Sequence, residues 1–278
     1  MNIAEFSMLT FAGSATAGFL GALTGLGGGV VIVPLLSLLF GVDIRYAIGA
    51  SLISVIATSS GAAAAYVKEG FSNIRLGMFF EMATTFGALL GAAIAGMIST
   101  QIIAVIFGFV LLYSAILSVR SRTPAKSEDT ADFFSNSLHL DGTYPSTRGL
   151  ISYHVRAVPI GFSLMFLAGT LSGLLGIGSG AVKVLAMDKA MRVPFKVSTT
   201  TSNFMIGVTA VASAGVYLNR GYIDPGLAMP VMLGVVLGSF IGSRVLVSSK
   251  TGLLRIVFAG VILALGLEML YNGFTGRF

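Results

Sequence analysis

The chain has 278 residues, of which 55% are hydrophobic and only 10% are charged, and its formal net charge at pH 7 is +6. Soluble domains carry about 25% charged residues, so this composition excludes a water-soluble globular protein. The positive charges lie mostly between apolar segments, where they set membrane topology and meet anionic lipid headgroups, so we expect no nucleic-acid partner.

The apolar segments predict an all-α polytopic membrane protein, since long aliphatic runs with scattered glycines are typical of membrane helices. The stretch before the first segment contains Glu5 and no basic residue, so we expect that segment to be retained rather than cleaved as a signal peptide. The segments are Phe6–Leu26, Val30–Phe40, Ile44–Val67, Ile74–Ile98, Ile102–Val119, Val158–Leu175, Ala181–Met191, Phe195–Leu218, Pro225–Val247 and Leu253–Tyr271.

A polar interval, residues 120–156, separates the two groups of segments and has a loop-like composition rich in Ser, Thr, Asp and Pro. We predict a cytoplasmic linker there, between a first membrane repeat (1–119) and a second (157–278). Both histidines, His139 and His154, lie in this linker, which argues against a histidine proton relay in the membrane. The histidines lack a flanking ligand pattern and the chain has no cysteine, so we expect no metal site.

The two halves repeat each other in sequence. With a constant offset of 151 and no gap, residues 18–95 overlay residues 169–246, and 18 of the 78 positions are identical. Seven of the identities are glycines, which shared apolar composition does not explain. Internal duplication is the usual plan of secondary transporters. Close glycine pairs such as Gly87 with Gly91, and Gly238 with Gly242, are explained by tight helix packing.

The short segments, residues 30–40 and 181–191, leave two topologies open. If both cross the membrane, each half has five passages and the repeats are inverted; if both turn back, each half has four and the repeats are parallel. With the linker in the cytoplasm, only the five-passage arrangement keeps Lys189, Lys196 and Lys250 inside. The charges therefore favour inverted repeats with both termini outside.

Glycine clusters at equivalent places suggest a ligand site. Gly25, Gly27, Gly28 and Gly29 end one long segment and open a short one, and Gly176, Gly178, Ser179 and Gly180 do the same in the second half. Such breaks expose backbone N–H groups to a ligand, and paired breaks in two repeats are typical of transporter binding sites. Two flexible kinks are the alternative.

Polar residues inside the apolar segments are further candidates. Lys183 would place an ammonium in or near the membrane, as part of an anion site or of an internal ion pair with Asp188 or Glu81. Thr201, Ser202 and Asn203, with Ser51 in the first half, offer hydrogen bonds to an oxyanion, although single hydroxyls often bond their own helix. Glu81 is a candidate for proton coupling, or for a counter-ion.

These residues resemble those of the TauE/SafE family of sulfite and organosulfonate exporters. The resemblance rests on Gly25–Gly29 followed by Val33-Pro34-Leu35, on Ala47–Ser51, on Gly176–Gly180, and on the run from Lys183 to Asn203. It implies an integral inner-membrane carrier for small sulfur oxyanions or related anions, without a cofactor, and it suggests a homodimer. The chain departs from the family pattern at Ser179, at Leu185 and at Lys183, which leaves the identity of the anion open.

The sequence thus favours an exporter of sulfite, sulfoacetate or a similar organosulfonate working by alternating access in the lipid bilayer. A passive anion channel on the same scaffold and a non-transporting membrane scaffold subunit are the alternatives. No hydrolase triad, paired acid and base, or metal cluster is present, so we do not expect an enzyme.

Overall fold

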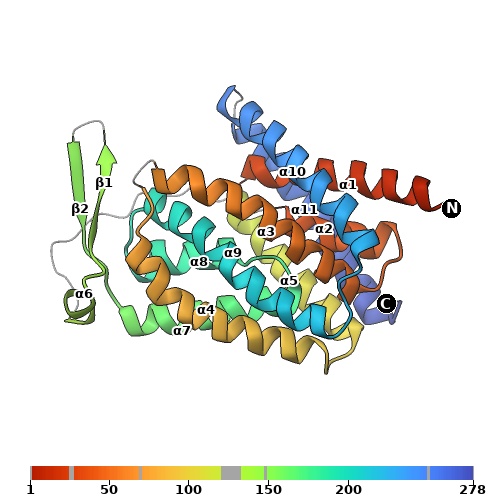
Figure 1. Cartoon of the computed structure of the whole chain (residues 1–278), viewed down its shortest axis with the longest axis horizontal. Coiled ribbons are helices and arrows are strands. Elements are labelled where there is room, and N and C mark those ends of the chain that lie inside the picture. Colours follow the sequence, from red (N-terminus) through yellow and green to blue (C-terminus); the bar gives the residue numbers. More distant parts are fainter. Residues whose placement is uncertain are drawn as a thin grey trace.

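The computed structural model describes residues 2–24, 28–68, 71–119, 133–146, 149–248 and 251–277. The helices lie side by side in an elongated bundle (Figure 1). The N- and C-terminal ends of the chain lie at one end of this bundle, and the linker elements lie at the opposite end.

The first half forms five helical stretches that follow the predicted apolar segments closely. The second of them, α2, continues without a break into a π-helical turn, η1. The elements are α1 (Ile3–Thr24), α2 (Gly29–Pro34), η1 (Leu35–Leu39), α3 (Ile44–Lys68), α4 (Ile74–Ala95) and α5 (Thr100–Val119).

The second half repeats this order, and its helices again match the predicted segments to within a few residues. Every one of α2, η1, α3, α4 and α5 starts 151 residues before its counterpart, which is the offset seen in the sequence. The elements are α7 (Val158–Leu175), α8 (Gly180–Leu185), η2 (Ala186–Ala190), α9 (Phe195–Asn219), α10 (Pro225–Ser248) and α11 (Thr251–Thr275).

The helices pack mainly across the two halves. The first helix of each half lies on the fourth helix of the other, so α1 packs on α10 and α7 packs on α4. The counterparts α3 and α9 pack on each other, as do α5 and α11. In both of these pairs the helices run in opposite directions: Tyr46 near the start of α3 contacts Tyr222 after the end of α9, and Gly273 late in α11 faces Val105 early in α5.

Glycines let the helix backbones approach closely, as the sequence suggested. A side chain at Gly87 or Gly91 of α4 would collide with backbone atoms of Phe166 and Thr170 in α7. Gly238, the counterpart of Gly87, would collide with the backbone of Ala15 in α1 in the same way. These glycines therefore serve helix packing.

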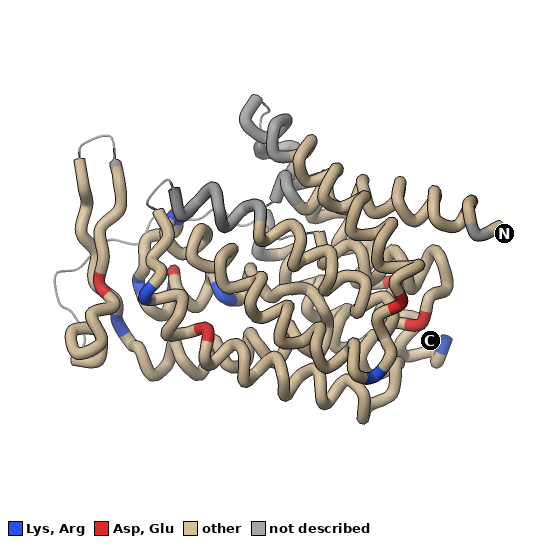
Figure 2. The backbone as a smooth tube through the Cα atoms, in the orientation of Figure 1, with Lys and Arg blue, Asp and Glu red and all other residues tan. Residues whose placement is uncertain are grey.

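The outer surface of the bundle is apolar. Met78, Met82 and Phe86 form an exposed stripe along α4, and charged residues lie mostly towards the two ends of the bundle (Figure 2). Among the described residues, four helices are long and apolar enough to cross a membrane: Ile74–Ala95, Val158–Leu175, Phe195–Asn219 and Pro225–Gly242. This surface fits lipid rather than water.

The linker is more ordered than its composition predicted. It contains a short helix, α6 (Phe133–Leu138), and an antiparallel hairpin of β1 (Gly142–Ser146) and β2 (Gly149–Tyr153). The expectation of a loop was wrong at this hairpin, which lies outside the apolar segments. Its last residue, Tyr153, is buried together with Leu140 and Val155, and this small apolar cluster holds the hairpin against the bundle.

Candidate functional site

The glycine breaks of the two halves meet where α3 crosses α9. A Cβ built on Gly29 would lie 3.2 Å from the carbonyl oxygen of Gly176 and 2.8 Å from Ser51 Oγ. Gly176 and Gly178 have φ values of +67° and +69°, a left-handed conformation that glycine adopts without strain. The predicted site residues Gly25 and Gly27 lie outside the described residues.

Ser51 and Ser202 make equivalent contacts with the two breaks. Ser51 Oγ donates a hydrogen bond to the Gly176 carbonyl at 2.8 Å and lies 3.5 Å from the Gly29 carbonyl. Ser202, its counterpart, lies 3.3 Å from the Gly180 carbonyl, the counterpart of Gly29. Because each hydroxyl donates its proton to a backbone carbonyl, neither donates to a ligand in this conformation.

Ser179 breaks the symmetry between the two halves. Its counterpart Gly28 is right-handed at φ −67°, whereas Ser179 is left-handed at φ 45°, an unusual conformation for a residue with a side chain. The Ser179 hydroxyl is buried and has no hydrogen-bond partner among the described residues. A buried donor without a partner costs about 1–3 kcal/mol. The described part of the chain leaves the hydrogen bond of this hydroxyl unused, so it is available to a ligand.

Lys183 lies one turn beyond the second glycine break, on α8, and is completely buried at 0% exposure. Its Nζ donates to Thr209 Oγ1 on α9 at 2.5 Å. Thr209 Oγ1 in turn lies 2.7 Å from Glu81 Oε1 on α4, and Glu81 is 8% exposed. Of the two acidic partners expected for Lys183, Glu81 is therefore the one coupled to it, whereas Asp188 pairs with Lys189 at 3.4 Å.

Thr209 is a site residue that the sequence analysis missed. It is one hydroxyl among many in α9, and no local pattern marks it; only the packing of α9 between α4 and α8 reveals its position. Thr84 and Thr85 on α4 complete the hydroxyl surroundings, with Thr85 Oγ1 3.3 Å from Glu81 Oε1 and Thr84 Oγ1 3.4 Å from Thr209 Oγ1.

One predicted site residue, Thr201, lies elsewhere. Thr201 is buried, and its hydroxyl accepts a hydrogen bond from the backbone N–H of Asn73 at 3.0 Å, so it joins the start of α9 to the loop before α4. Asn203 is half-buried, and its amide makes no hydrogen bond with the part of the chain that the structure describes. Thr201 thus supports the helix arrangement instead of facing the glycine breaks.

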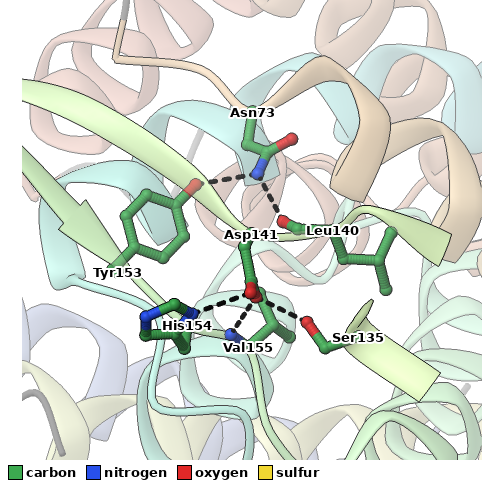
Figure 3. A network of polar contacts seen from close by, with 7 residues as sticks. All are labelled: Asn73, Ser135, Leu140, Asp141, Tyr153, His154 and Val155. Atoms are coloured by element: carbon green, nitrogen blue, oxygen red, sulfur yellow. Dashed lines mark hydrogen bonds and ion pairs between the residues drawn. The ribbon is translucent and has the colours of Figure 1, made fainter. Parts of the chain in front are cut away.

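The linker is fastened to the bundle by Asn73 (Figure 3). The Asn73 amide nitrogen donates to the Leu140 carbonyl at 2.9 Å and contacts the Tyr153 hydroxyl at 2.8 Å. Its side-chain oxygen accepts from the N–H of Leu76 at 3.0 Å and caps α4. Burial raises the pKa of Tyr153 to about 12, and the hydrogen bond to Asn73 partly opposes this shift.

A second group of contacts orders the linker itself. Asp141 accepts hydrogen bonds from Ser135 Oγ at 2.6 Å and from the Val155 N–H at 2.8 Å, and it contacts His154 Nδ1 at 2.8 Å (Figure 3). Burial acts to raise the pKa of Asp141, but the hydrogen bonds from Ser135, His154 and Val155 outweigh it and leave the pKa below its ordinary value.

The two ends of the α3–α9 pair carry equivalent cation–aromatic contacts. The guanidinium of Arg45 lies 5.7 Å from the ring centre of Tyr222, and the ammonium of Lys196 lies 4.2 Å from that of Phe71. Lys196 and Tyr222 are the counterparts of Arg45 and Phe71, again at an offset of 151. The site with the glycine breaks thus lies between two similar end contacts.

The site brings together one buried cation, one buried carboxylate, several hydroxyls and the buried backbone of the two glycine breaks, and these groups are able to bind a charged molecule. No group of three or more His, Asp or Glu side chains that could hold a metal occurs among the residues with described positions.

Comparisons with known proteins show which family the chain resembles. The family described as "Sulfite exporter TauE/SafE" matches residues 10–269. The chain is similar to the probable membrane transporter protein YunE of Bacillus subtilis, with 27% identity covering 92% of this chain and 94% of the relative. It is also similar to a probable membrane transporter protein of Xylella fastidiosa, with 25% identity covering 96% of both chains. No solved structure matches the chain significantly.

Proposed function

Since the chain belongs to the sulfite exporter TauE/SafE family, and relatives matched over nearly its whole length are named membrane transporters, we propose that it exports a small sulfur-containing anion. The substrate class is sulfite, sulfoacetate or a similar organosulfonate. The protein would work by alternating access as a multi-pass protein of the cell inner membrane.

The observation that carries this proposal is the complete burial of Lys183. A charged side chain at the centre of a membrane helix costs about 2.5–3.5 kcal/mol on insertion scales, so it persists where it has a function or a partner. Lys183 lies one turn from Gly180, at a break in the helices, and a small anion is the ligand that suits an ammonium there. In this proposal the ammonium of Lys183 is the group that selects anions over neutral or cationic molecules.

The remaining contacts to the anion would come from the glycine breaks. Gly28, Gly29, Gly178 and Gly180 carry no side chain that would keep a ligand from the backbone, and the side chains that now pack against them, such as Val235 and Ile206, would move aside on binding. The hydroxyl of Ser179 bonds to none of the residues that the structure describes. Ser51 and Ser202 lie beside the breaks and would turn their hydroxyls from the carbonyls to the anion on binding. The amide of Asn203 on α9 would supply a further contact.

We also propose that the two membrane repeats, 1–119 and 157–278, are inverted with respect to each other and cross the membrane five times each. The opposite directions of α3 and α9, which are counterparts, support this arrangement, as do those of α5 and α11. The common position of the two termini, opposite the linker, also supports it (Figure 1). The linker 120–156 would then lie in the cytoplasm.

Inverted repeats allow two related conformations, one with the site open to one side of the membrane and one with it open to the other side. The equivalent contacts of Arg45 with Tyr222 and of Lys196 with Phe71 suit the two gates of such a cycle. Opening one end would break one contact and keep the other. A homodimer in the bilayer is compatible with this cycle.

The first experiment is a thermal-stability measurement of the purified protein with sulfite, sulfoacetate, taurine, thiosulfate, sulfate and acetate. A ligand at 100 times its dissociation constant stabilises the folded state by about 2.7 kcal/mol. We expect a rise in Tm with sulfite or a sulfonate and none with acetate. The same rise in a Lys183→Met variant would remove Lys183 from the site, and no rise with any anion would contradict the anion site.

Flux measurements in proteoliposomes distinguish a carrier from a channel or scaffold. We expect saturable uptake of the stabilising anion and accelerated exchange when the same anion is present on both sides. Ohmic current without exchange would indicate a channel, and the absence of flux would indicate a non-transporting subunit.

A further inference from the structure

Lys183, Thr209 and Glu81 form one connected line of polar groups inside an apolar bundle. The ammonium and the carboxylate bind the same hydroxyl oxygen, at 2.5 and 2.7 Å. The counterparts of these residues in the other half are Ile32, Thr58 and Met232. The threonine is thus present in both halves, whereas the two charges are present only once.

The hydroxyl of Thr209 has a single proton and three acceptors within reach, of which Thr84 Oγ1 at 3.4 Å is the most distant. Its oxygen accepts from Lys183, so its own proton goes to one of the two close acceptors, Glu81 Oε1 or the Met205 carbonyl, which is 2.9 Å away. In the first half, Thr58 donates to the equivalent carbonyl of Ser54 at 2.9 Å. The bond to the helix carbonyl is therefore the arrangement that a threonine takes here when no carboxylate is present.

The second carboxylate oxygen of Glu81 is buried and has no hydrogen-bond partner in the described part of the chain. An ionised carboxylate accepts several hydrogen bonds, and a buried oxygen without one is unfavourable. A proton bound at Oε2 would remove the negative charge from an apolar region. This oxygen is therefore the place at which the structure can take up a proton.

Lys183 is the charged group that acts on Glu81 among the residues with described positions. Of the two helices packed against α4, α7 contains no titratable residue, and α9 has its ionisable groups, Lys196 and Tyr217, in its first and last turns. The ionisation of Glu81 and the charge balance of Lys183 are therefore linked.

We infer that Glu81 binds a proton when an anion binds at Lys183, so that one proton travels with each anion. This inference rests on the proposed function. In the empty state the Glu81 carboxylate balances the ammonium through Thr209. In the loaded state the anion balances the ammonium, Glu81 is neutral, and the Thr209 hydroxyl turns to the Met205 carbonyl.

Each proton taken up during the transport cycle is also released. A proton from water on the side where the anion enters forms the O–H bond at Glu81 Oε2, and the same proton returns to water on the other side when the anion leaves. Because each ligand raises the affinity for the other, anion and proton bind together. Both states of the site are neutral for a monovalent anion, so membrane voltage has no effect on its transport, and net flux follows the summed gradients of anion and proton.

The test uses proteoliposomes with the full chain and methanesulfonate, a monovalent anion at all pH values near neutrality. Sulfoacetate replaces it if methanesulfonate is not carried; it is divalent near neutrality, so one proton per anion then leaves one negative charge and its flux should depend on voltage. Flux of the labelled anion and internal pH are followed together, while K⁺ and valinomycin set the voltage. We expect about one proton per anion, because the site has one carboxyl to neutralise for each anion that binds the ammonium, with the two binding events linked. We also expect methanesulfonate flux that does not change with voltage.

The informative variant is Glu81→Gln, which keeps the size of the side chain and an oxygen for Thr209 but cannot ionise. It should still carry the anion, with no proton movement and with flux that now depends on voltage. Glu268→Gln removes an exposed carboxyl of α11 and should leave the proton-to-anion ratio unchanged. Tm values of both variants check that they are folded.

The outcomes separate the inference from the proposed function. Anion flux without proton movement in the unaltered protein, or with proton movement unchanged in Glu81→Gln, overturns the coupling and leaves the transporter intact. No flux of methanesulfonate, sulfoacetate or sulfite overturns the proposed function, and the coupling with it.

Discussion

Asn73 and Asp224 are counterparts in the two halves and cap equivalent helices, but only Asn73 also holds the linker. Asn73 Oδ1 accepts from the Leu76 N–H at 3.0 Å, and Asp224 Oδ1 accepts from the Leu227 N–H at 3.1 Å. The additional bonds of Asn73, to Leu140 and Tyr153, use the amide nitrogen that an aspartate lacks. Of these two cap residues, Asn73 therefore ties its end of the bundle to the described part of the linker.

Replacing Asn73 by Asp should separate these two roles. The new carboxylate keeps the cap of α4 but repels the Leu140 carbonyl, so we expect the hairpin 142–153 to lose protection in hydrogen exchange while the helices keep theirs. Asn73→Ala should in addition lose the cap and destabilise the protein by about 1 kcal/mol. Equal protection of the hairpin in Asn73→Asp and the unaltered protein would show that the amide contacts do not hold the linker.

The linker should loosen in acid. The folded-state pKa of Asp141 lies below its ordinary value of 3.8, so its carboxylate stabilises the folded linker at pH values above about 3.8. This stabilisation is lost as the pH falls through the lowered pKa. We expect hydrogen-exchange protection factors of the hairpin to drop below pH 4, and Asp141→Asn to have the weaker protection already at pH 6. A pH-dependent drop of equal size in Asp141→Asn would assign the effect to another group.

Thr209 should tolerate serine but not valine. Thr209→Val leaves Lys183 and Glu81 without their shared hydroxyl, and an unsatisfied buried polar group costs about 1–3 kcal/mol, so both Tm and anion flux should fall strongly. Thr209→Ser keeps the hydroxyl and should keep the flux. The matched control is Thr58→Val, which removes only hydroxyl contacts to the carbonyls of its own helix and should have a small effect. A Thr58 variant as impaired as Thr209→Val would contradict the special role of Thr209.

Gly91 should be essential to the contact between α4 and α7. A leucine there collides with the backbone of Thr170 and Leu174, and overpacking costs about 1–3 kcal/mol or more, so Gly91→Leu should lower Tm by several degrees. Gly215 of α9 has open space where a Cβ would lie, and Gly215→Ala should raise stability by about 0.5–1 kcal/mol through helix propensity. Similar Tm shifts in both variants would argue against close packing at Gly91.

The helices were predictable from sequence because apolar runs and their breaks are local properties. The start of α3 at Ile44 and of α4 at Ile74 agrees with the predicted segments, and the offset of 151 can be read directly from the order of the amino acids. The partners of these helices were not predictable, since nothing near Gly87 in sequence says that it faces Phe166 of the other half. For the same reason the sequence suggested Glu81 only as one of two partners for Lys183.

The hydroxyl-rich run at the start of α9 shows a different limit. Thr201, Ser202 and Asn203 are adjacent and look alike as oxyanion ligands, but on a helix successive residues point about 100° apart. Thr201 therefore meets the loop at Asn73, while Ser202 meets the glycine break. Thr209, two turns later, has the contact to Lys183 and was not distinguishable from other threonines that bond their own helix.

The π-helical turns bear on the ancestry of the fold. Leu35–Leu39 and Ala186–Ala190 form such a turn at equivalent places, and a π turn holds one residue more per hydrogen-bonded ring than an α turn. The offset between the halves is the same before this turn, at Gly29 and Gly180, and after it, at Thr100 and Thr251. Neither half has thus gained or lost a residue there relative to the other. If the two repeats arose by the duplication that we propose, the extra residue was already present in the single ancestral unit before the gene duplicated.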